Sequence, residues 1–414
     1  MTRHTRCVLT SQVQIPENLS TITRRGVSRI ISEEEFTAML QRGRPLRLKM
    51  GFDPSRPDIH LGHVVGLRKL RQLQDLGHQV ILIVGDWTAQ IGDPSGRSAT
   101  RTMLTHAEVL ENAESYMRQF FKVVDRERTQ VEWQSQWFGE FTLADVIELT
   151  SRFTINQFLH REDFANRYSQ NQPIAITEML YPLMQAYDSV VIESDVEFGG
   201  TDQMFNLLVG RELQGMMGQT PQQCFMMPIL VGTDGVQKMS KSLDNYVALE
   251  EPPQDMYGKL MSLPDSLITS YYEYLTDVPD ADISEMQQAI ETETANPMDF
   301  KKGLARRITA IFHDSDAANA AEANFEQVVQ RRDLPDDIPE ISRADIGEDL
   351  IGRVLVRTGL AASNGEARRL VSQGAVEIIH ADGRRESVTA PNTPAPEAGA
   401  VVRAGRRRFV RIAD

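Results

Sequence analysis

Cysteine is almost absent from this sequence. The 414 residues include two cysteines, Cys7 and Cys224, which lie far apart and form no C-x-x-C pair. Neither a disulfide framework nor a cysteine-rich zinc site is therefore expected, and a reducing compartment, the cytoplasm, is predicted. The sequence also lacks a run of about 18 apolar residues, the length that a membrane-spanning helix needs. Its N-terminal segment has early basic residues but no continuous apolar stretch of the signal-peptide type.

Acidic residues outnumber basic ones over most of the chain, whereas basic residues outnumber acidic ones near its end. The 44 Lys and Arg residues face 58 Asp and Glu residues, and the net charge of −14 argues against indiscriminate binding of nucleic acid. Residues 351–414 nevertheless contain eleven basic and six acidic residues. This imbalance predicts that the last segment holds any polyanionic partner, although a randomly basic small domain is an alternative on charge alone.

Three short apolar runs predict buried strands of a parallel sheet. They are LRLKMGF (46–52), VILIVGD (80–86) and FMMPIL (225–230). Between the first two, apolar residues recur at helical spacing in LGHVVGLRKLRQLQDLGH (61–78). This order of strand, helix and strand indicates an α/β fold with a Rossmann-like, doubly wound parallel sheet.

Composition predicts how the chain divides into parts. Residues 1–45 are expected to form an N-terminal extension with a lead-in helix, and residues 46–245 the Rossmann-like domain. Residues 246–330 are mostly helical in composition, whereas residues 331–350 are acidic, contain two prolines and are predicted to be a linker. Residues 351–414 combine one amphipathic helical pattern with short apolar runs, which predicts a small α+β domain.

The turn PDIHLGHVV (57–65) opens the predicted helix after the first strand. His60 and His63 share one helical face, while Gly51 and Gly62 let a backbone approach closely. A helix N-terminus at the carboxyl edge of a parallel strand presents free N–H groups, so an anion such as a triphosphate is the natural occupant. A metal site would need a third ligand, and no H-E-x-x-H pattern exists. A purely structural histidine pair remains an alternative for this motif alone.

A second motif lies in VGTDGVQKMSKSLDN (231–245). Lys238 and Lys241 sit in a stretch softened by Gly232 and Gly235. A mobile loop with two basic side chains suits closure over a phosphate chain. An exposed basic turn without a function is the alternative when the motif is taken alone.

Together, HLGH and KMSKS resemble the paired signature of class I aminoacyl-tRNA synthetases. Three further stretches are similar to tyrosyl-tRNA synthetases of the bacterial branch with a full KMSKS sequence: IGDPSGR (91–97), YPLMQAYDS (181–189) and FGGTDQMFN (198–206). The resemblance runs from about Leu46 to the C-terminus. It implies an enzyme that activates L-tyrosine with ATP, accompanied by Mg²⁺ but without a structural metal, and transfers tyrosine to tRNA(Tyr). It also implies a homodimer.

The resemblance assigns residues to ATP. His60, with Ser55, is expected at the γ-phosphate and His63 at the ribose and inner phosphates, while the basic side chains close over pyrophosphate. The residues expected to act on the phosphates are His60, His63, Ser55, Lys238, Lys241, Arg97 and Arg101. Further contacts to the adenylate are expected from Gly51, Asp53, Gly62, Gly200, Asp202, Met239 and Ser240.

The resemblance also assigns a tyrosine site. Asp93, Tyr181 and Gln185 match positions that hold the substrate α-ammonium group, and Asp188 would accept the phenolic hydroxyl. Tyr181, Gln185 and Asp188 are spaced along one face of one helix, although that spacing alone would equally suit a core helix. The expected tyrosine-binding residues are Asp93, Tyr181, Gln185, Asp188, Gln203 and Thr88.

The first strand departs from the best-known tyrosyl enzymes. Lys49 stands where that branch has a tyrosine touching the substrate phenol, and Met50 stands where a cysteine reaches the ribose. Asp188 is therefore expected to carry more of the phenol recognition.

The tail resembles the S four-type RNA-binding fold that ends bacterial tyrosyl enzymes. The resemblance rests on SNGEARRLVSQGAVEI (363–378). A basic helix beside a basic strand could follow an RNA backbone, and a solvated basic surface is the alternative. The expected tRNA-binding residues are Arg368, Arg369, Arg406, Arg407 and Arg408.

Three other functions are weighed against this one. A tryptophanyl-tRNA synthetase shares the class but normally lacks such a tail. A small-molecule adenylyltransferase uses an H-x-G-H turn without KMSKS. A non-catalytic RNA-binding protein on a synthetase scaffold would not be expected to retain all the histidines, lysines and tyrosine-site residues.

Overall fold

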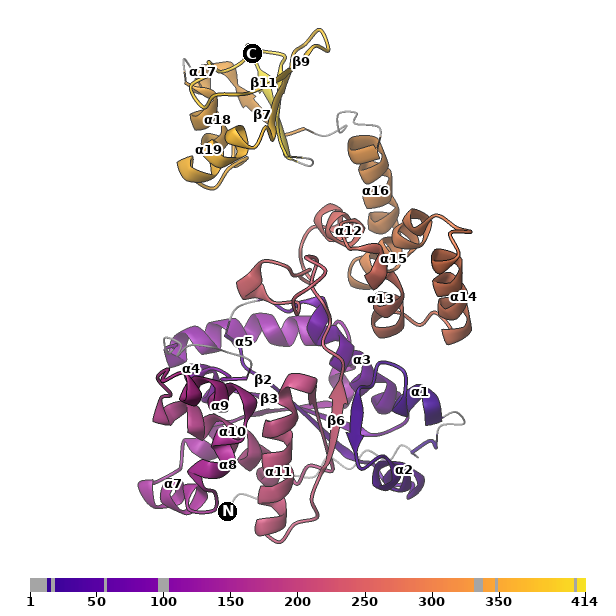
Figure 1. Ribbon diagram of the computed structural model, residues 1–414, viewed down its shortest axis with the longest axis vertical. Helices are drawn as coiled ribbons and strands as arrows, with labels where there is room; N and C mark the ends of the chain where they lie inside the picture. The colour runs from indigo at the N-terminus through magenta and orange to yellow at the C-terminus, as the bar shows by residue number, and fades with distance from the viewer. Residues whose placement is uncertain are drawn as a thin grey trace. The chain divides into compact units, whose positions relative to one another are not determined.

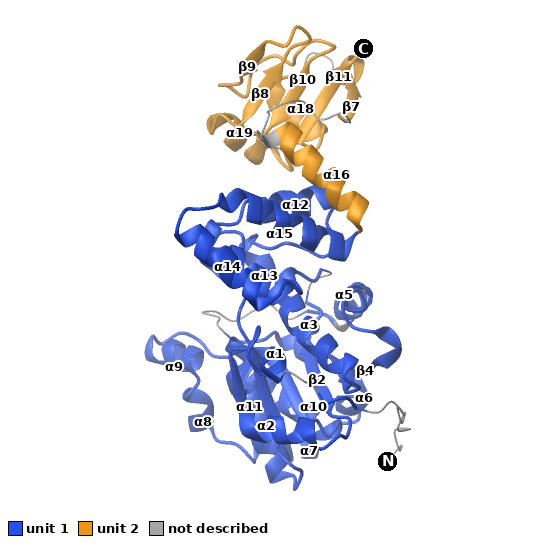
Figure 2. Cartoon of the chain, turned by 90° about the vertical axis from the view of Figure 1, so that its right-hand side faces the viewer, with its two compact units in different colours: residues 1–313 blue, residues 314–414 orange. Residues whose placement is uncertain are grey.

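The computed structural model describes residues 13–15, 19–55, 58–95, 104–330, 338–346, 349–405 and 408–414. The chain consists of two compact units, Met1–His313 and Asp314–Asp414, shown in blue and orange in Figure 2. Each unit has its own sheet.

In the described part of the first unit, six strands form one sheet in the order β1-β6-β5-β2-β3-β4. Strands β2, β3 and β6 of this sheet are labelled in Figure 1. All neighbouring strands are parallel except β1, which runs antiparallel to β6. The strands are β1 (Arg29–Ile31), β2 (Arg47–Phe52), β3 (Gln79–Val84), β4 (Thr129–Trp133), β5 (Val196–Gly200) and β6 (Gln223–Met227). The three predicted strands are confirmed as β2, β3 and β6, and so is the predicted fold class.

Helices flank this sheet and extend beyond it. They are α1 (Leu19–Thr23), α2 (Glu33–Gln41), α3 (Leu61–Asp75), α4 (Thr88–Ile91), α5 (His106–Phe120), α6 (Ser135–Phe138), α7 (Leu143–Thr150), α8 (Ile155–Leu159), α9 (Glu162–Ser169), α10 (Ile176–Val191), α11 (Met204–Met216), α12 (Pro253–Met261), α13 (Ile268–Leu275), α14 (Asp280–Glu291) and α15 (Pro297–Phe312).

The two faces of the sheet carry different helices. Successive residues of a strand point to opposite faces of the sheet. Lys49 and Met50 of β2 therefore point to different faces. Lys49 reaches Ser189 of α10 on one face. On the other, Met50 lies against Gly66 of α3, where an added Cβ would come within 2.6 Å of the methionine Cε. Helix α10 therefore packs on the Lys49 side and α3 on the Met50 side.

Helix α3 forms where the apolar periodicity predicts it. Val64, Leu67, Leu70 and Leu73 are all buried against the sheet. The helix ends at Asp75, and Gly77 follows with φ of +97°, a conformation that glycine adopts without strain. The N-terminus of α3 thereby lies just beyond the carboxyl end of β2.

The strand order reverses beside β2. The chain proceeds outward from β2 to β3 and β4, and then returns to place β5 on the other side of β2. In open α/β sheets, ligands bind beyond the carboxyl ends of the strands at such a reversal. The segments that follow β2, β3, β5 and β6 therefore converge on the place where a ligand is expected.

The second unit contains its own helices and sheet. Its elements are α16 (Ser315–Phe325), the π-helix η5 (Glu326–Gln330), β7 (Glu340–Ser342), α17 (Arg343–Ile346), α18 (Ile351–Arg357), α19 (Asn364–Ser372), β8 (Val376–Ile379), β9 (Arg385–Ser387), β10 (Val401–Ala404) and β11 (Arg408–Ala413). The described strands form a sheet in the order β7-β11-β10-β8-β9. Residues 331–337 of the predicted linker lie outside the described residues. Strand β7, which belongs to the rest of the predicted linker, pairs with β11.

None of the described helices combines the length and the apolar character that crossing a bilayer requires.

Candidate active site

His60 and His63 are fixed by the backbone of their own turn. His60 is the N-cap of α3, and its Nδ1 accepts the N–H of Gly62 at 3.2 Å. His63 Nδ1 accepts the N–H of His60 at 3.3 Å, and the two ring centroids lie 4.0 Å apart. Because Nδ1 accepts in both rings, a neutral ring carries its proton on Nε2, which is then available as a donor.

Both histidines are held in the neutral form. Burial lowers the pKa of His60 well below its usual value, and the charges of His63, Lys241 and Lys238 lower it further. Burial and Lys241 lower the pKa of His63 to about 3. The pair therefore offers neutral Nε2–H donors at neutral pH rather than positive charges.

The KMSKS segment packs onto this turn. An added Cβ at Gly62 would lie 3.7 Å from the Cβ of Met239, which is buried. Shortly after the motif, Val247 O accepts the N–H of Leu61 at 3.0 Å, and Ala248 forms a β-bridge with His60. The structure thus brings together two motifs that lie far apart in the sequence.

The two lysines of the motif are engaged by different partners. Lys238 Nζ lies 2.8 Å from Oδ2 of Asp202, which follows β5. Lys241 Nζ donates to the hydroxyl of Tyr116 on α5 at 3.0 Å and lies 4.8 Å from the ring centroid. Ser240 caps the short 3-10 helix Lys241–Leu243. Both ammonium groups lie close enough to His60 and His63 to lower the pKa of each histidine.

The remaining residues expected at ATP follow the strand ends. Gly51, Asp53 and Ser55 lie at the end of β2 or just beyond it, and Gly200 ends β5. Arg97 and Arg101 lie outside the described residues.

A chain of hydrogen bonds begins at Asp53. Tyr181 donates its hydroxyl to Asp53 Oδ2 at 2.8 Å, and Thr88 donates to Asp53 Oδ1 at 2.7 Å. Burial and the charge of Asp53 raise the pKa of Tyr181 well above its usual value, so Tyr181 keeps its proton. Thr88 also contacts Gln134 Oε1 at 3.0 Å. Asp53, which we expected at the adenylate, here contacts two residues expected at tyrosine.

Asp188 lies at the buried end of this chain. Its Oδ2 accepts from Gln134 Nε2 at 2.8 Å and its Oδ1 from Trp137 Nε1 at 3.1 Å. Burial raises its pKa to about 7, while the charge of Lys49 and the two hydrogen bonds oppose that rise. Each carboxylate oxygen has two acceptor positions, so both oxygens retain capacity for one more donor.

Asp93 and Gln203 meet at a second point. Gln203 Nε2 donates to Asp93 Oδ2 at 2.6 Å, and Asn206 donates to Gln203 Oε1 at 3.0 Å. Buried Arg161 lies behind them: it donates to Ser95 Oγ at 2.9 Å and comes within 4.0 Å of Asp93. This cluster ties the segment after β3 to the segment after β5.

Lys49 does not open onto the site. It is 0% exposed and forms an ion pair of 2.9 Å with Glu197, its direct neighbour on β5. Gln185 contacts both members of this pair.

The chain is similar to known proteins over nearly its whole length. Residues 41–330 match the family described as tRNA synthetases class I (W and Y). The chain is 55% identical over 397 residues to the tyrosine–tRNA ligase of Dehalococcoides mccartyi strain CBDB1, an alignment that covers 96% of this chain and 98% of that protein. The chain belongs to the class I tyrosine–tRNA ligases. The corresponding ligase of Thermotoga maritima is 51% identical over 398 residues, with coverage of 96% and 98%.

Solved structures agree with the fold of this ligase. The tyrosyl-tRNA synthetase of Archaeoglobus fulgidus, complexed with L-tyrosine, matches with a TM-score of 0.60 at 24% identity and covers 73% of this chain and 98% of its own. A C-terminally truncated mitochondrial synthetase of Aspergillus nidulans matches with a TM-score of 0.62 at 20% identity, covering 75% and 93%. At these identities the likeness establishes the fold alone.

Several residues that contact the expected site residues were not predicted from the sequence. Gln134, Trp137, Glu197, Arg161 and Tyr116 lie in stretches without a recognised motif. The only available signal was polar residues next to strands: Gln134 follows β4 directly, and Glu197 lies within the apolar stretch of β5. Gln134 meets Thr88 and Asp188 across 46 and 54 residues, and Tyr116 meets Lys241 across 125 residues, which no local pattern indicates.

Among the described residues of the ligase, no group of three or more His, Cys, Asp or Glu side chains is placed to hold a metal ion. Where the sequence places the triphosphate, the histidine Nε2–H groups, the lysines and the backbone N–H groups are donors, which suit phosphate oxygens.

The second unit of the ligase presents basic side chains on α19 and at the start of β11. Arg368 and Arg369 are exposed on α19, and Arg408 contacts Glu366 of the same helix at 3.3 Å. The three therefore share one region of this unit. Arg406 and Arg407 lie outside the described residues.

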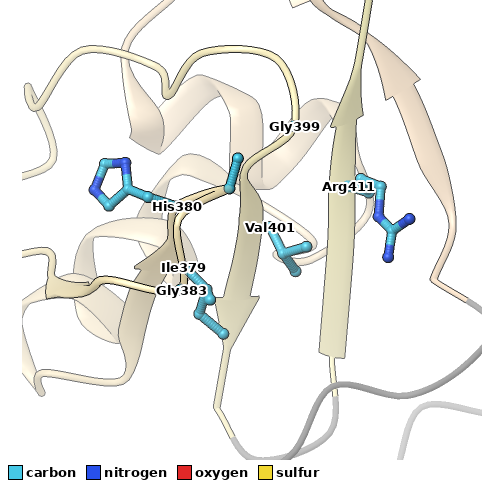
Figure 3. A pocket seen from close by; sticks show the side chains of 7 residues that line it. Ile379, His380, Gly383, Gly399, Val401 and Arg411 are labelled. Atoms are coloured by element: carbon cyan, nitrogen blue, oxygen red, sulfur yellow. The ribbon is translucent and has the colours of Figure 1, made fainter.

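A pocket of about 280 Å³ lies elsewhere in the second unit (Figure 3). His380 and Arg411 extend to opposite sides of it, and His380 contacts Glu386 at 3.0 Å. None of Arg368, Arg369 and Arg408 lines it. The pocket is therefore separate from the described basic residues expected to bind tRNA.

Proposed function

We propose that this chain activates L-tyrosine with ATP and charges tRNA(Tyr), using the residues assigned from the sequence. The observation that carries the residue assignment is Asp188. A carboxylate buried at the end of α10, fixed by Gln134 and Trp137, retains acceptor positions for a phenolic hydroxyl. Phenylalanine would leave those positions unpaired, which costs binding free energy.

In the first step, the tyrosine carboxylate attacks the α-phosphate of ATP, and pyrophosphate leaves. The carboxylate is already a nucleophile, so no protein nucleophile is needed. The protein must position the two substrates and stabilise charge on the phosphates. His60 and His63 supply neutral Nε2–H donors from a rigid turn, with Ser55 nearby. Lys238 and Lys241 exchange their present partners for pyrophosphate oxygens, and Arg97 and Arg101 assist them.

Tyrosine is held at both ends in this proposal. Asp93, Tyr181 and Gln185 surround the α-ammonium group, with Thr88 supporting Asp53. Gln203 lies next to the substrate carboxylate. Asp202 meets the ribose hydroxyls after Lys238 has released it, with Gly200 giving the backbone close access. Mg²⁺ accompanies ATP as part of the substrate, because it keeps several waters and binds phosphates readily.

In the second step, a ribose hydroxyl of the terminal adenosine of tRNA attacks the tyrosyl carbonyl, and AMP leaves. Arg368, Arg369 and Arg406–Arg408 of the second unit hold the RNA backbone through charge. We place the enzyme in the cytoplasm, where charged tRNA is used.

We also propose a homodimer, as the family implies. Large apolar side chains are strongly exposed along α7–α10 of the first unit, whose inner faces share one core cluster. The exposed residues are Leu143, Ile147, Ile155, Tyr168 and Ile176. Exposed apolar surface of this kind is typical of a protein interface.

ATP–pyrophosphate exchange with a panel of amino acids tests the proposed activity, followed by charging of total tRNA. Tyrosine alone is expected to support exchange, and only tRNA(Tyr) is expected to be charged. Activation by tryptophan, or by no amino acid, would overturn the proposal.

Removal of residues 314–414 tests the role of the second unit. This boundary leaves the first unit complete. The truncated chain is expected to retain exchange and to lose tRNA charging. Equal charging by the truncated and full chains would show that the second unit does not hold tRNA.

A further inference from the structure

Lys49 and Glu197 form a closed, buried network behind the tyrosine site. The lysine Nζ contacts Glu197 Oε1 at 2.9 Å, donates to the carbonyl oxygen of Gln185 at 2.7 Å and donates to Ser189 Oγ at 2.7 Å. An ammonium group has three N–H bonds, and these three contacts use all of them. Lys49 therefore does not replace the phenol-binding tyrosine of related enzymes as a substrate ligand.

Glu197 is saturated in the same way. Its Oε1 accepts from Gln185 Nε2 at 3.0 Å, and its Oε2 accepts from Ser189 at 3.1 Å and from Gln222. The side chain is 1% exposed. A carboxylate with this many donors holds each of them in a defined orientation, because any rotation would leave a buried polar atom unpaired.

The orientation of Gln185 follows from these contacts. A glutamine amide has a donor end and an acceptor end. Glu197 engages the Nε2 end, so the amide keeps its Oε1 as an acceptor that has no hydrogen-bond partner among the residues that the structure describes. An ammonium group is a donor only, and it can bond to this oxygen but not to the amide nitrogen. The Lys49 contact to the Gln185 carbonyl fixes the backbone of α10 at the same residue.

We propose that the Lys49–Glu197 ion pair is a positioning pair that turns the amide oxygen of Gln185 toward the α-ammonium group of the bound amino acid. Neither residue touches the substrate. A buried ion pair is weak evidence for stability, because well-packed apolar residues often replace one without loss. Its place beneath a helix that carries Tyr181, Gln185 and Asp188 gives it a role in selecting substrates with a free amino group. This inference rests on the proposed activation of tyrosine.

The test compares two ligands that differ only in the ammonium group: L-tyrosine and 3-(4-hydroxyphenyl)propanoate. Glu197→Gln removes the charge but keeps the shape, and it offers an N–H to which the Gln185 oxygen can turn. In calorimetric titrations, this variant is expected to bind tyrosine about tenfold or more weakly, the loss of one charge-assisted hydrogen bond. Binding of the propanoate is expected to be unchanged, as is the KM for ATP.

A second variant guards against misfolding. The paired change Lys49→Met with Glu197→Met removes both charges and leaves neither buried alone. It also removes the acceptor for Gln185, so it is expected to show the same selective loss of tyrosine binding. Equal loss of both ligands in the two variants, or loss of neither, would overturn the proposal and indicate a purely structural pair.

Glu178→Gln is the matched control. Glu178 lies on the same helix and forms a buried ion pair with Arg167. This variant is expected to lower the melting temperature without changing the ratio of tyrosine to propanoate affinity. The wild-type chain is titrated first: if it binds no tyrosine, the proposed function fails, and the positioning pair is not the cause.

Discussion

Lys49 and Lys238 each form an ion pair with an acidic residue of β5 or of the segment that follows it, but in different surroundings. Lys49 and Glu197 are 0% and 1% exposed, and further partners enclose both. Lys238 and Asp202 are 47% and 25% exposed, and their contact of 2.8 Å faces solvent. The first pair lies behind the proposed tyrosine end of the site, and the second lies at the proposed nucleotide end.

This difference matches what each end has to do. Recognition of one amino acid requires fixed donors and acceptors, which a buried network supplies because rearrangement would leave polar atoms unpaired. Stabilisation of a pyrophosphate that forms and leaves requires charges that change partners at low cost, and an exposed ion pair has little net stability to lose. The histidines at the nucleotide end combine both properties, since their backbone contacts fix Nδ1 and leave Nε2 available.

The largest expected difference between the two ends is in stability. Lys49→Met leaves a buried carboxylate unpaired and is expected to lower the free energy of unfolding by about 3–5 kcal/mol. Lys238→Met is expected to lower it by no more than about 1 kcal/mol. Urea unfolding followed by tryptophan fluorescence measures this, because all three tryptophans lie in the first unit. Equal effects would remove the contrast between the two pairs.

Substitutions at the nucleotide end should slow the activation of tyrosine without weakening tyrosine binding. His60→Ala and Lys241→Ala each remove a donor that acts on developing phosphate charge. The maximal rate of ATP–pyrophosphate exchange is expected to fall roughly 100- to 1,000-fold, with tyrosine affinity nearly unchanged. Equilibrium binding and exchange kinetics on the same preparation test this. A large loss of tyrosine binding together with normal activation would contradict the assigned roles.

Asp188→Asn should impair the use of tyrosine and leave the KM for ATP nearly unchanged. The amide keeps the shape but weakens the acceptor for the phenolic hydroxyl, and one of its ends is a donor. The ratio kcat/KM for tyrosine is expected to fall about 10- to 100-fold, the loss of a hydrogen bond to a charged group. The corresponding ratio for phenylalanine should change much less, and so should the KM for ATP. Unaltered discrimination between the two amino acids would exclude Asp188 as the phenol acceptor.

The smallest expected difference is in pH dependence. The pKa of Asp188 is raised to about 7, so its ionised form is dominant above that value and is lost as the pH falls through it. Tyrosine affinity should therefore decrease about tenfold per pH unit at most on the acid side. The pKa of His63 is lowered to about 3, so His63 stays neutral between pH 5.5 and 8.5. Its titration therefore causes no change in the KM for ATP over that range. Measuring the KM for tyrosine and the KM for ATP as a function of pH between 5.5 and 8.5 compares the two ends directly.

Local patterns predicted three of the six described strands in the sheet of the first unit, and they predicted the two motif segments. The helical periodicity after β2 and the apolar runs of β2, β3 and β6 are strong signals, and each corresponds to an element of the structure. Strands β1, β4 and β5 were not predicted. They have three to five residues, and β5 contains Glu197 and two glycines, which interrupt an apolar pattern.

The site could be predicted only in part, because some of its residues have a role only through contacts with residues far away in the sequence. His60, Lys238 and Asp188 belong to motifs that can be recognised one at a time. Gln134 and Trp137 acquire their meaning from a contact with Asp188, which lies 54 and 51 residues further along the chain. Lys49 could be recognised as unusual, but its role depends on burial against β5 and α10.

The sequence by itself determined the order of the elements, the motif residues and the uneven distribution of charge, because these depend on residue type and spacing along the chain. Only the tertiary structure decided which polar atoms face one another. It placed Met239 of the KMSKS segment against the histidine turn, and it placed Lys49 against Gln185 and Glu197. The physical reason is that a buried charge must be paired, and its partner is set by strand register and helix packing across distant segments.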